Sequence, residues 1–255
     1  MRVSRLFIIV LVPPFDGTNQ DLRDEAINGA KALFTRYSAG AKSGNVREVT
    51  LLQLDNAVDA DADRSGGQLD GRLQRTAHGS VGNDRPQDVG RYIIGHFSHL
   101  SMTVGPWRAE RLALFVKNLM QMLNCSEIRK LALVACNDAE EQLELMDAPE
   151  KSYVEQFAKY LGQNGFRPKI AGWDSFVSIL YEGTPHVSKK EKKRNEPAHF
   201  GRKIIQHARH NKLSTPTARN AHKMFFQWVI PDDDPENAHV AIQEHSGWTD
   251  NPEFK

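Results

Sequence analysis

Residues 89–96 read VGRYIIGH and residues 130–136 read KLALVAC, and these two stretches decide the fold class. Each is a short, nearly continuous apolar run of the kind that forms a strand buried on both faces of a parallel sheet. The first run ends on His96 and the second on Cys136, two side chains that can take part in chemistry. About 40 residues separate them, enough for one crossover through a loop, a helix and a return strand.

Strands and helices alternate on both sides of these runs. Continuous apolar or β-branched runs predict strands, and apolar residues repeated every three to four positions predict helices. The expected strands are 5–12, 46–54, 89–95, 130–135, 168–173 and 223–230. The expected helices are 18–37, 106–123, 151–164 and 198–210. Residues 176–181 should form a β-hairpin with residues 184–187. This order predicts an α/β fold with a mostly parallel six-stranded sheet and helices on both faces.

Length and composition indicate one globular domain over residues 1–255. The 255 residues include 33 Lys and Arg against 32 Asp and Glu, and 40% are hydrophobic, which is ordinary for a globular protein. Two cysteines exclude a disulfide framework and a four-cysteine metal site, and we expect no metal. No apolar run reaches the ~20 residues needed to span a bilayer. Residues 6–12 after Arg2 and Arg5 imitate a signal peptide, but Pro13-Pro14 end the run early and no Ala-x-Ala pattern follows, so a first buried strand is favoured.

The charges are segregated along the chain. Residues 189–223 hold 11 Lys and Arg against 2 Asp and Glu, whereas residues 231–255 hold 1 against 7. A basic segment this dense either binds polyanions or forms a solvated surface, and both readings stay open. Residues 55–88 have no apolar period, so we expect a long exposed loop that is functional or disordered.

His96 and Cys136 are candidate catalytic residues because of where their strands end. Reactive side chains of an open α/β sheet gather at the carboxyl ends of the strands, and a βαβ unit of this length often places its strands side by side. Cysteine attacks as the thiolate, and an imidazole can take its proton and later protonate the leaving amine. The alternative is that both residues simply pack in the core. Cys125 reads as structural, and His99 is a weaker alternative imidazole.

These motifs resemble the caspase-like (clan CD) cysteine peptidases, such as gingipain, clostripain, legumain and separase. Within them, the chain is most similar to the inositol-hexakisphosphate-activated, self-cleaving protease domains of large bacterial toxins. The resemblance rests on residues 70–73 (DGRL), 94–96 (IGH), 109–113 (AERLA), 133–136 (LVAC), 156–157 (QF), 164–165 (NG) and the 176–187 hairpin, and covers about residues 6–230. It implies a caspase-like three-layer sandwich with the hairpin as a flap, and thiol protease (hydrolase) activity.

The resemblance also implies a role for each matching residue. Cys136 would be the nucleophile and His96 the general acid and base, and the backbone N–H groups of Cys136 and of the Gly95–Phe97 turn would hold the oxyanion. The clan usually has glycine after the histidine. Phe97 stands there instead, and it could narrow the cleft or disfavour a positive φ.

The resemblance also implies a specificity pocket just past the fifth strand, where this clan often builds one. Asp174, with Trp173 and Phe176, would line it, and a carboxylate there could select Arg or Lys before the scissile bond. The alternative for Asp174 is an ordinary surface turn residue.

In the toxin proteases the flap couples to a basic inositol-phosphate site. The candidate polyanion-binding residues are Lys190, Lys192, Lys193, Arg194, Arg202 and Lys203. Inositol hexakisphosphate is therefore expected as an activator, while the chemistry itself needs no cofactor. The substrate would be a protein or peptide, which could be the chain itself, and the protein could be cytoplasmic or a bacterial effector or toxin delivered into a host cell. Nucleic acid is not favoured, because no aromatic residues interleave with the basic ones.

Two other functions stay open. Phe97 favours a catalytically inactive caspase-like binding module, and the basic segment favours a polyanion-binding protein in which the cysteine and histidine only pack. The sequence contains no G-x-S-x-G, P-loop or H-E-x-x-H motif, so serine hydrolase, NTPase and zincin functions have no support.

Overall fold

The computed structural model of the chain describes residues 5–13, 15–41, 48–54, 89–98, 101–122, 127–128, 130–135, 151–175, 177–182, 200–205 and 223–244. Several predictions fall outside these residues: the loop at 55–88, the hairpin strand at 184–187, and the side chains of His99, Cys125, Cys136, Phe176, Lys190, Lys192, Lys193 and Arg194. In the described ranges no helix is both long and apolar enough to cross a membrane.

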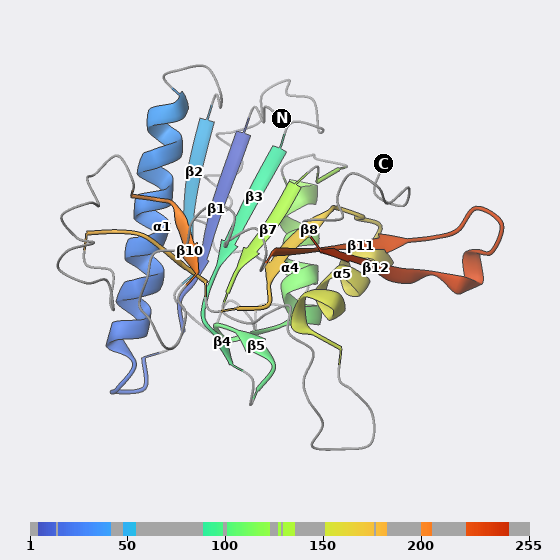
Figure 1. Ribbon diagram of the computed structural model, residues 1–255, viewed down its shortest axis with the longest axis horizontal. Coiled ribbons are helices and arrows are strands. Elements are labelled where there is room, and N and C mark those ends of the chain that lie inside the picture. The colour runs from blue at the N-terminus through green and yellow to red at the C-terminus, as the bar shows by residue number, and fades with distance from the viewer. Residues whose placement is uncertain are drawn as a thin grey trace.

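A central sheet of seven strands organises the described part of the fold (Figure 1). Its strands are β1 (Arg5–Leu11), β2 (Glu48–Leu54), β3 (Val89–Ile94), β7 (Lys130–Val134), β8 (Ile170–Trp173), β11 (Lys223–Val229) and β12 (His239–Glu244), in the order β12-β11-β8-β7-β3-β1-β2. The five strands from β8 to β2 are parallel, and β11 is antiparallel to both of its neighbours. The predicted α/β class with a mostly parallel sheet is confirmed.

The strand count predicted from the sequence is wrong by one, because β12 adds a seventh strand. It pairs with β11 from Met224 opposite Glu244 to Val229 opposite His239. Ala241 is buried while Ile242 is exposed, so the alternation of a strand is present, although acidic charge dominates this part of the sequence. The short helix η4 (Pro235–Asn237) lies at the end of the projection that β11 and β12 form in Figure 1.

Side chains on the two faces of the sheet pack in two separate cores, because successive residues of a strand point to opposite sides. α4 (Ala109–Met122) and α5 (Tyr153–Gln163) cover one face, where Ile9 packs with Leu112 and Phe157. α1 (Gln20–Ala41) covers the other, where Ile8 packs with Leu33. Figure 1 shows α1 on the opposite side of the sheet from the helix pair. We call these the α4–α5 face and the α1 face.

A separate two-stranded ribbon lies on the α1 face. It consists of β9 (Val177–Ile179) and β10 (Lys203–Ile205), paired antiparallel with Ile204 opposite Ser178. The helix expected over 198–210 is therefore wrong at its centre, while the pairing of β9 with residues 184–187 stays a prediction. Three-residue strands are too short to show a period, and their state depends on the partner strand. We call this pair the β9–β10 ribbon.

A small antiparallel sheet follows β3 directly. Its strands are β4 (Phe97–Ser98), β5 (Thr103–Val104) and β6 (Trp107–Arg108), in the order β4-β5-β6. The buried Tyr153 at the start of α5 donates a 3.0 Å hydrogen bond from its hydroxyl to the carbonyl oxygen of Trp107. This bond ties the small sheet to the α4–α5 face.

Candidate active site

The carboxyl ends of β3 and β7 lie side by side. The two strands pair in parallel with Ile94 opposite Val134, and the backbone N–H of Gly95 donates to the Val134 carbonyl oxygen at 3.3 Å. The predicted adjacency of these strands is therefore confirmed. Beyond this pair, β3 continues to His96, and β7 continues to the buried Ala135. Cys136 comes next and lies outside the described residues, so its distance from His96 stays a prediction.

Two glycines hold the backbone around His96. A Cβ atom at the buried Gly95 would lie 2.6 Å from Cγ1 of Val104, so no side chain fits there without displacing β5. The N–H of Gly105 donates to the His96 carbonyl oxygen at 2.8 Å. Gly105 has a φ of +56°, which glycine adopts without strain, and a Cβ there would lie 3.0 Å from the carbonyl oxygen of Leu11. The backbone of His96 is thus held from both sides.

The imidazole of His96 is half-buried and hydrogen-bonded to the first turn of α1. Its Nε2 atom lies 2.9 Å from the carbonyl oxygen of Leu22. Because a carbonyl oxygen only accepts, Nε2 must carry the hydrogen and donate it. In the neutral ring this leaves a lone pair on Nδ1, which can take a proton. Helix α1 therefore sets both the orientation and the tautomer of His96.

The start of α1 is anchored by Asp16. Its carboxylate accepts hydrogen bonds from the backbone N–H groups of Thr18 at 2.8 Å and Asn19 at 3.0 Å, and from the Thr18 hydroxyl at 2.9 Å. These bonds, with the Thr18 N–H first among them, lower the pKa of the Asp16 carboxyl. Arg23 also donates to the carbonyl of Pro13. The turn that carries Leu22 is consequently fixed to the loop that leaves β1.

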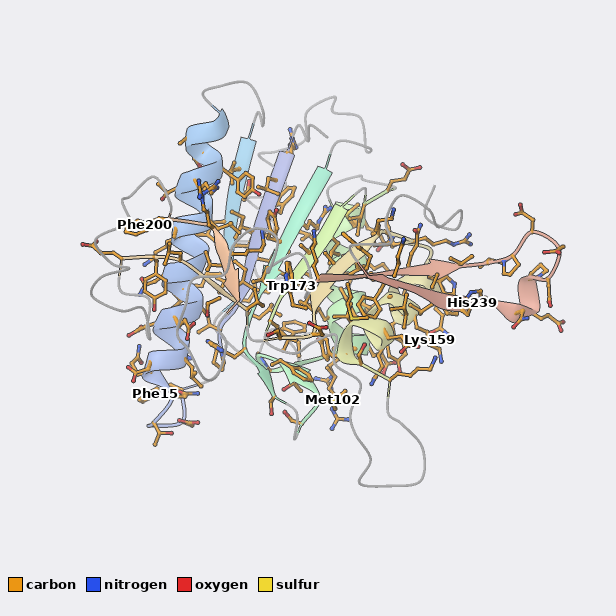
Figure 2. The ribbon with its side chains drawn as sticks, in the orientation of Figure 1. Phe15, Met102, Lys159, Trp173, Phe200 and His239 are labelled. Carbon is orange, nitrogen blue, oxygen red and sulfur yellow. The ribbon has the colours of Figure 1, made fainter. Side chains whose placement is uncertain are left out.

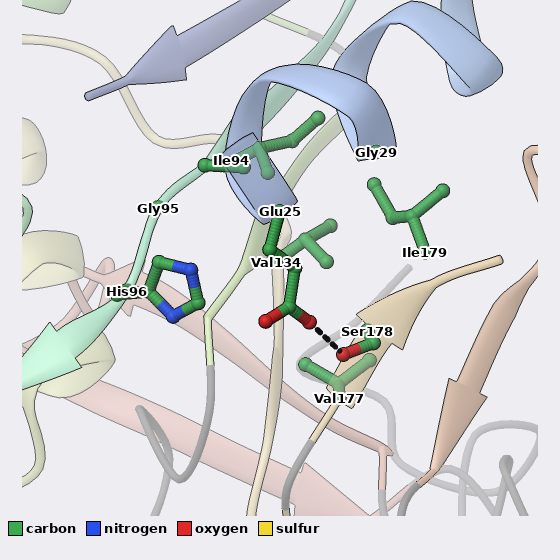
Figure 3. A pocket seen from close by; sticks show the side chains of 10 residues that line it. Glu25, Gly29, Ile94, Gly95, His96, Val134, Val177, Ser178 and Ile179 are labelled. Atoms are coloured by element: carbon green, nitrogen blue, oxygen red, sulfur yellow. Dashed lines mark hydrogen bonds between the residues drawn. The ribbon is translucent and has the colours of Figure 1, made fainter. Parts of the chain in front are cut away.

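A pocket of about 30 Å³ lies beside His96, on the α1 face of the sheet (Figure 3). Its walls are mostly apolar, and its polar side chains are those of Glu25, His96 and Ser178. The hydroxyl of the buried Ser178 donates a 2.7 Å hydrogen bond to Oε1 of Glu25. The pocket thus brings together the end of β3, helix α1 and strand β9.

Sequence reasoning did not single out Glu25 or Ser178, nor the carbonyl of Leu22. A topological signal for Glu25 and Leu22 was available. A helix that follows β1 starts at the carboxyl edge of the sheet, the same edge at which His96 was expected. No comparable signal existed for Ser178, because β9 lies outside the main sheet and its position depends on a contact with α1.

The residues just past β9 run along an acidic part of α1. Burial, followed by the negative charges of Glu25, Asp24 and Asp21, raises the pKa of Tyr181 to about 12. A carboxylate field that keeps a phenol neutral also attracts cations. The surroundings of Tyr181 are therefore negatively polarised.

Phe97, the departure from the clan pattern, packs on the α4–α5 face. Its ring centroid lies 5.7 Å from that of Tyr153, and it contacts the core of that face. Among the described residues, Met102 is the non-glycine residue with a positive φ, so Phe97 is not strained in that way. Phe97 does not line the pocket beside His96.

The other predicted site residues that the structure describes do not line the pocket beside His96. Asp174 is exposed after β8, and Trp173 lies buried in the middle of the molecule (Figure 2), neither lining the pocket beside His96. Lys203 begins β10 and is half-buried, with Nζ 4.0 Å from the ring centroid of Tyr92. Arg202, just before β10, is exposed. The substrate-binding and polyanion-binding roles stay predictions. In the part of the chain that the structure describes, no three His, Cys, Asp or Glu side chains gather as a metal site.

Comparison with solved structures adds a remote likeness. Neither the protein-family models nor the curated proteins include a match. Among solved structures, the crystal structure of caspase-1 from Spodoptera frugiperda matches with a TM-score of 0.31 and 13% sequence identity, over 66% of this chain and 60% of that one. The aligned part spans less than two thirds of that caspase chain. So remote a likeness transfers no residue roles, and the chemistry must come from this chain's own side chains.

Proposed function

We propose that the chain is a caspase-like cysteine endopeptidase in which Cys136 is the nucleophile and His96 the general acid and base. The observation that carries this proposal is the parallel pairing of β3 with β7, with Ile94 opposite Val134. His96 and Cys136 each follow this pair by two residues, on strands that in a sheet lie about 4.8 Å apart. The tautomer of His96 supports the same roles, because Nε2 donates to Leu22 and leaves Nδ1 to act as the base.

In the proposed reaction, His96 takes up and releases a proton in each of two steps, formation of a thioester and its hydrolysis. Nδ1 of His96 takes the proton of the Cys136 thiol, and the thiolate attacks the scissile carbonyl carbon. The imidazolium then protonates the leaving amine as the C–N bond breaks and a thioester remains. His96 next takes a proton from water as the water oxygen attacks the thioester carbon. The C–S bond breaks, the carboxylic acid product leaves, and the imidazolium returns the proton to the Cys136 thiolate.

The oxyanion would be held by backbone N–H groups. The proposed donors are the N–H groups of Cys136 and Phe97, while the N–H of Gly95 donates to the Val134 carbonyl. One such donor contributes about 10²–10³-fold to the rate in other enzymes. Because the ring of Phe97 packs on Tyr153, its backbone can serve without its side chain filling the pocket, which supports an active enzyme over an inactive binding module.

We further propose that a polyanion such as inositol hexakisphosphate activates the enzyme through the β9–β10 ribbon. Lys203 stands opposite Ile179, and β9 supplies three residues to the pocket beside His96. An anion gathered by Arg202, Lys203 and the basic residues before them would therefore act on a wall of the pocket. A coupling of about 1–3 kcal/mol corresponds to a change of about 5–150-fold in affinity between the two sites.

Labelling with a peptide-based cysteine-reactive electrophile tests the dyad. Cys136→Ala should abolish labelling and His96→Ala should slow it by about 10²–10⁴-fold, the usual contribution of a general base. Cys125→Ala is the matched control and should label like the wild type. Labelling that survives Cys136→Ala, or that is insensitive to His96→Ala, would reject the peptidase.

Inositol hexakisphosphate can be tested as an activator by three measurements. Intact-mass analysis with and without it reports self-processing, the property expected of a toxin-type or effector protease, and the melting temperature and the labelling rate of Cys136 report binding and activation. The ligand should raise the melting temperature and accelerate labelling of Cys136. Arg202→Glu should weaken both effects, while Lys159→Glu, an exposed lysine on α5, should weaken neither. An unchanged melting temperature at low salt would leave the dyad standing without this activator.

A further inference from the structure

We propose that the hydrogen bond between Ser178 and Glu25 is a positioning link that lets the β9–β10 ribbon set the orientation of His96. The inference rests on the proposed function, since it concerns the control of the proposed general base. Neither residue would touch the reacting atoms. Both would act through α1, which makes them positioning residues.

The first step in the argument is the spacing of two contacts on α1. Leu22 and Glu25 are three positions apart, so they lie on the same face of the helix, about one turn from each other. The carbonyl of Leu22 accepts from Nε2 of His96 at 2.9 Å, and the carboxylate of Glu25 accepts from Ser178 at 2.7 Å. One turn of α1 therefore binds the imidazole of His96 through the Leu22 carbonyl and strand β9 through the Glu25 carboxylate.

The second step is the close fit between β9 and α1. Gly29 follows Glu25 by one turn, and a Cβ atom there would lie 3.3 Å from Cβ of Ile179. Helix and strand thus approach closely at Ile179, beside the charge-assisted hydrogen bond at Ser178, a type of bond about twice as strong as a neutral one. A displacement of β9 would pull on the first turns of α1.

The third step is that β9 is held by packing on the α1 face and not by pairing with a strand of the main sheet. It belongs to the β9–β10 ribbon and not to the seven-stranded sheet. Tyr181 lies just past β9. Burial, and then the negative charges of Glu25, Asp24 and Asp21 on α1, raise its pKa to about 12, so this end of the ribbon also lies along α1. The position of the ribbon is therefore transmitted to α1 and from there to the Leu22 carbonyl. When that carbonyl moves, the imidazole loses the acceptor that orients it.

The pH dependence of Cys136 alkylation by iodoacetamide tests the link, with Cys125→Ala as the background. This small reagent needs no substrate cleft, so it reports only how well His96 stabilises the thiolate. In Ser178→Ala we expect alkylation at pH 6 to slow by roughly three- to tenfold, and the rate at pH 9.5, where most cysteine is already ionised, to stay unchanged. Ser178→Thr keeps the hydroxyl and should restore the wild-type profile.

Further variants separate positioning from stability. Glu25→Ala should shift the profile as Ser178→Ala does, and the double variant should be no worse than either single one, because both remove the same bond. Ser152→Ala removes another buried hydroxyl, the one that accepts from the Glu155 N–H at the start of α5. It should lower the melting temperature without shifting the profile. Should Ser178→Ala not fold, Glu25→Ala carries the test.

The outcomes for the link and for the dyad are distinguishable. If His96→Ala slows alkylation at pH 6 relative to pH 9.5 while Ser178→Ala and Glu25→Ala both keep the wild-type profile, the link is overturned and the peptidase stands. If His96→Ala itself leaves the profile unchanged, the proposed dyad fails and the link fails with it. A shifted profile in Ser152→Ala equal to that in Ser178→Ala would also overturn the link, because it would report general destabilisation.

Discussion

The two faces of the central sheet differ in how their covering helices are joined to its strands. On the α4–α5 face, fully buried apolar side chains such as those of Leu112 and Phe157 form one continuous core. The α1 face also has an apolar core, but polar contacts join its covering elements to one another and to the sheet. Tyr37 of α1 bonds to Tyr92 of β3 through their hydroxyls at 2.8 Å, and Ser178 bonds to Glu25. The pocket beside His96 opens on this second face.

The difference indicates how stability and adjustment are divided. Apolar packing at crystal-like density resists any change of shape, since each shift loses many contacts at once. A hydrogen bond contributes about 0.5–1.5 kcal/mol net and can be exchanged for one with water. The α4–α5 face should therefore carry most of the stability, while the α1 face can shift its covering elements at low cost.

The largest effect is expected from truncating the core of the α4–α5 face. Phe157 is fully buried in α5, and Phe157→Ala should lower the free energy of unfolding by about 3–5 kcal/mol through lost burial and the cavity left behind. Urea unfolding followed by circular dichroism measures it. Phe15, 60% exposed before α1, is the matched control, and Phe15→Ala should cost less than about 0.5 kcal/mol. A loss below about 1 kcal/mol in Phe157→Ala would break the comparison.

A pair of helix glycines sharpens the comparison. A Cβ at Gly162 in α5 would lie 2.0 Å from Cγ of Trp228, whereas one at Gly29 in α1 would lie 3.3 Å from Cβ of Ile179. Gly162→Ala should cost about 1–3 kcal/mol by overpacking. In Gly29→Ala, the gain of about 0.5–1 kcal/mol in helix propensity should roughly offset the tighter contact. Equal melting temperatures for the two variants would show that the faces tolerate added volume alike.

Removing one polar contact of the α1 face should have a smaller effect. Tyr37→Phe deletes the hydroxyl that bonds to Tyr92 and should cost about 0.5–1.5 kcal/mol, measured by urea unfolding. Tyr160→Phe on α5 is the control, since its hydroxyl makes no hydrogen bond with the described part of the chain, and it should be nearly neutral. A loss above about 3 kcal/mol in Tyr37→Phe would mean that the α1 face is as rigid as its opposite.

The smallest effect is an alkaline one. Tyr181 has a folded-state pKa raised to about 12 from an ordinary 10, so the unfolded chain releases this proton first. The contribution of Tyr181 is therefore present below pH 10 and is lost as the pH rises toward 12. Tyr181→Phe should make the melting temperature less sensitive to pH between 10 and 12. The change should be small because the side chain is only half-buried, and a steeper dependence in the variant would contradict the sign.

Much of this arrangement could be predicted from the sequence. The strands ending at Ile94 and Val134 are continuous apolar runs, and the crossover length between them favoured the parallel pairing that the structure contains. These features are local or depend on one short connection, which makes them readable. The α4–α5 face was readable for the same reason, since its two helices show a clear period.

What could not be predicted depends on contacts between distant segments. β10 is a strand because Lys203–Ile205 pairs with Val177–Ile179, and no pattern within three residues encodes a partner that far away. β12 was hidden by the acidic charge around it. Glu25 looked like any exposed helix residue, because its meaning comes from Ser178 on a strand outside the main sheet. The β9–β10 ribbon and the polar contacts of the α1 face therefore emerged only in three dimensions.

The place of β1 in the strand order has a consequence for the time course of synthesis. β1 lies between β2 and β3, and β3 begins about 80 residues after β1 ends, which takes about 4–16 s to translate at typical rates. During that interval β1, α1 and β2 can pack together. The edge of the highly apolar strand β1 that later pairs with β3 is still unpaired. A nascent chain at this stage presents a ready template for pairing with a neighbour. Slower translation between β2 and β3 should therefore increase aggregation, and chaperone binding to the nascent chain should be strongest before residue 94 emerges.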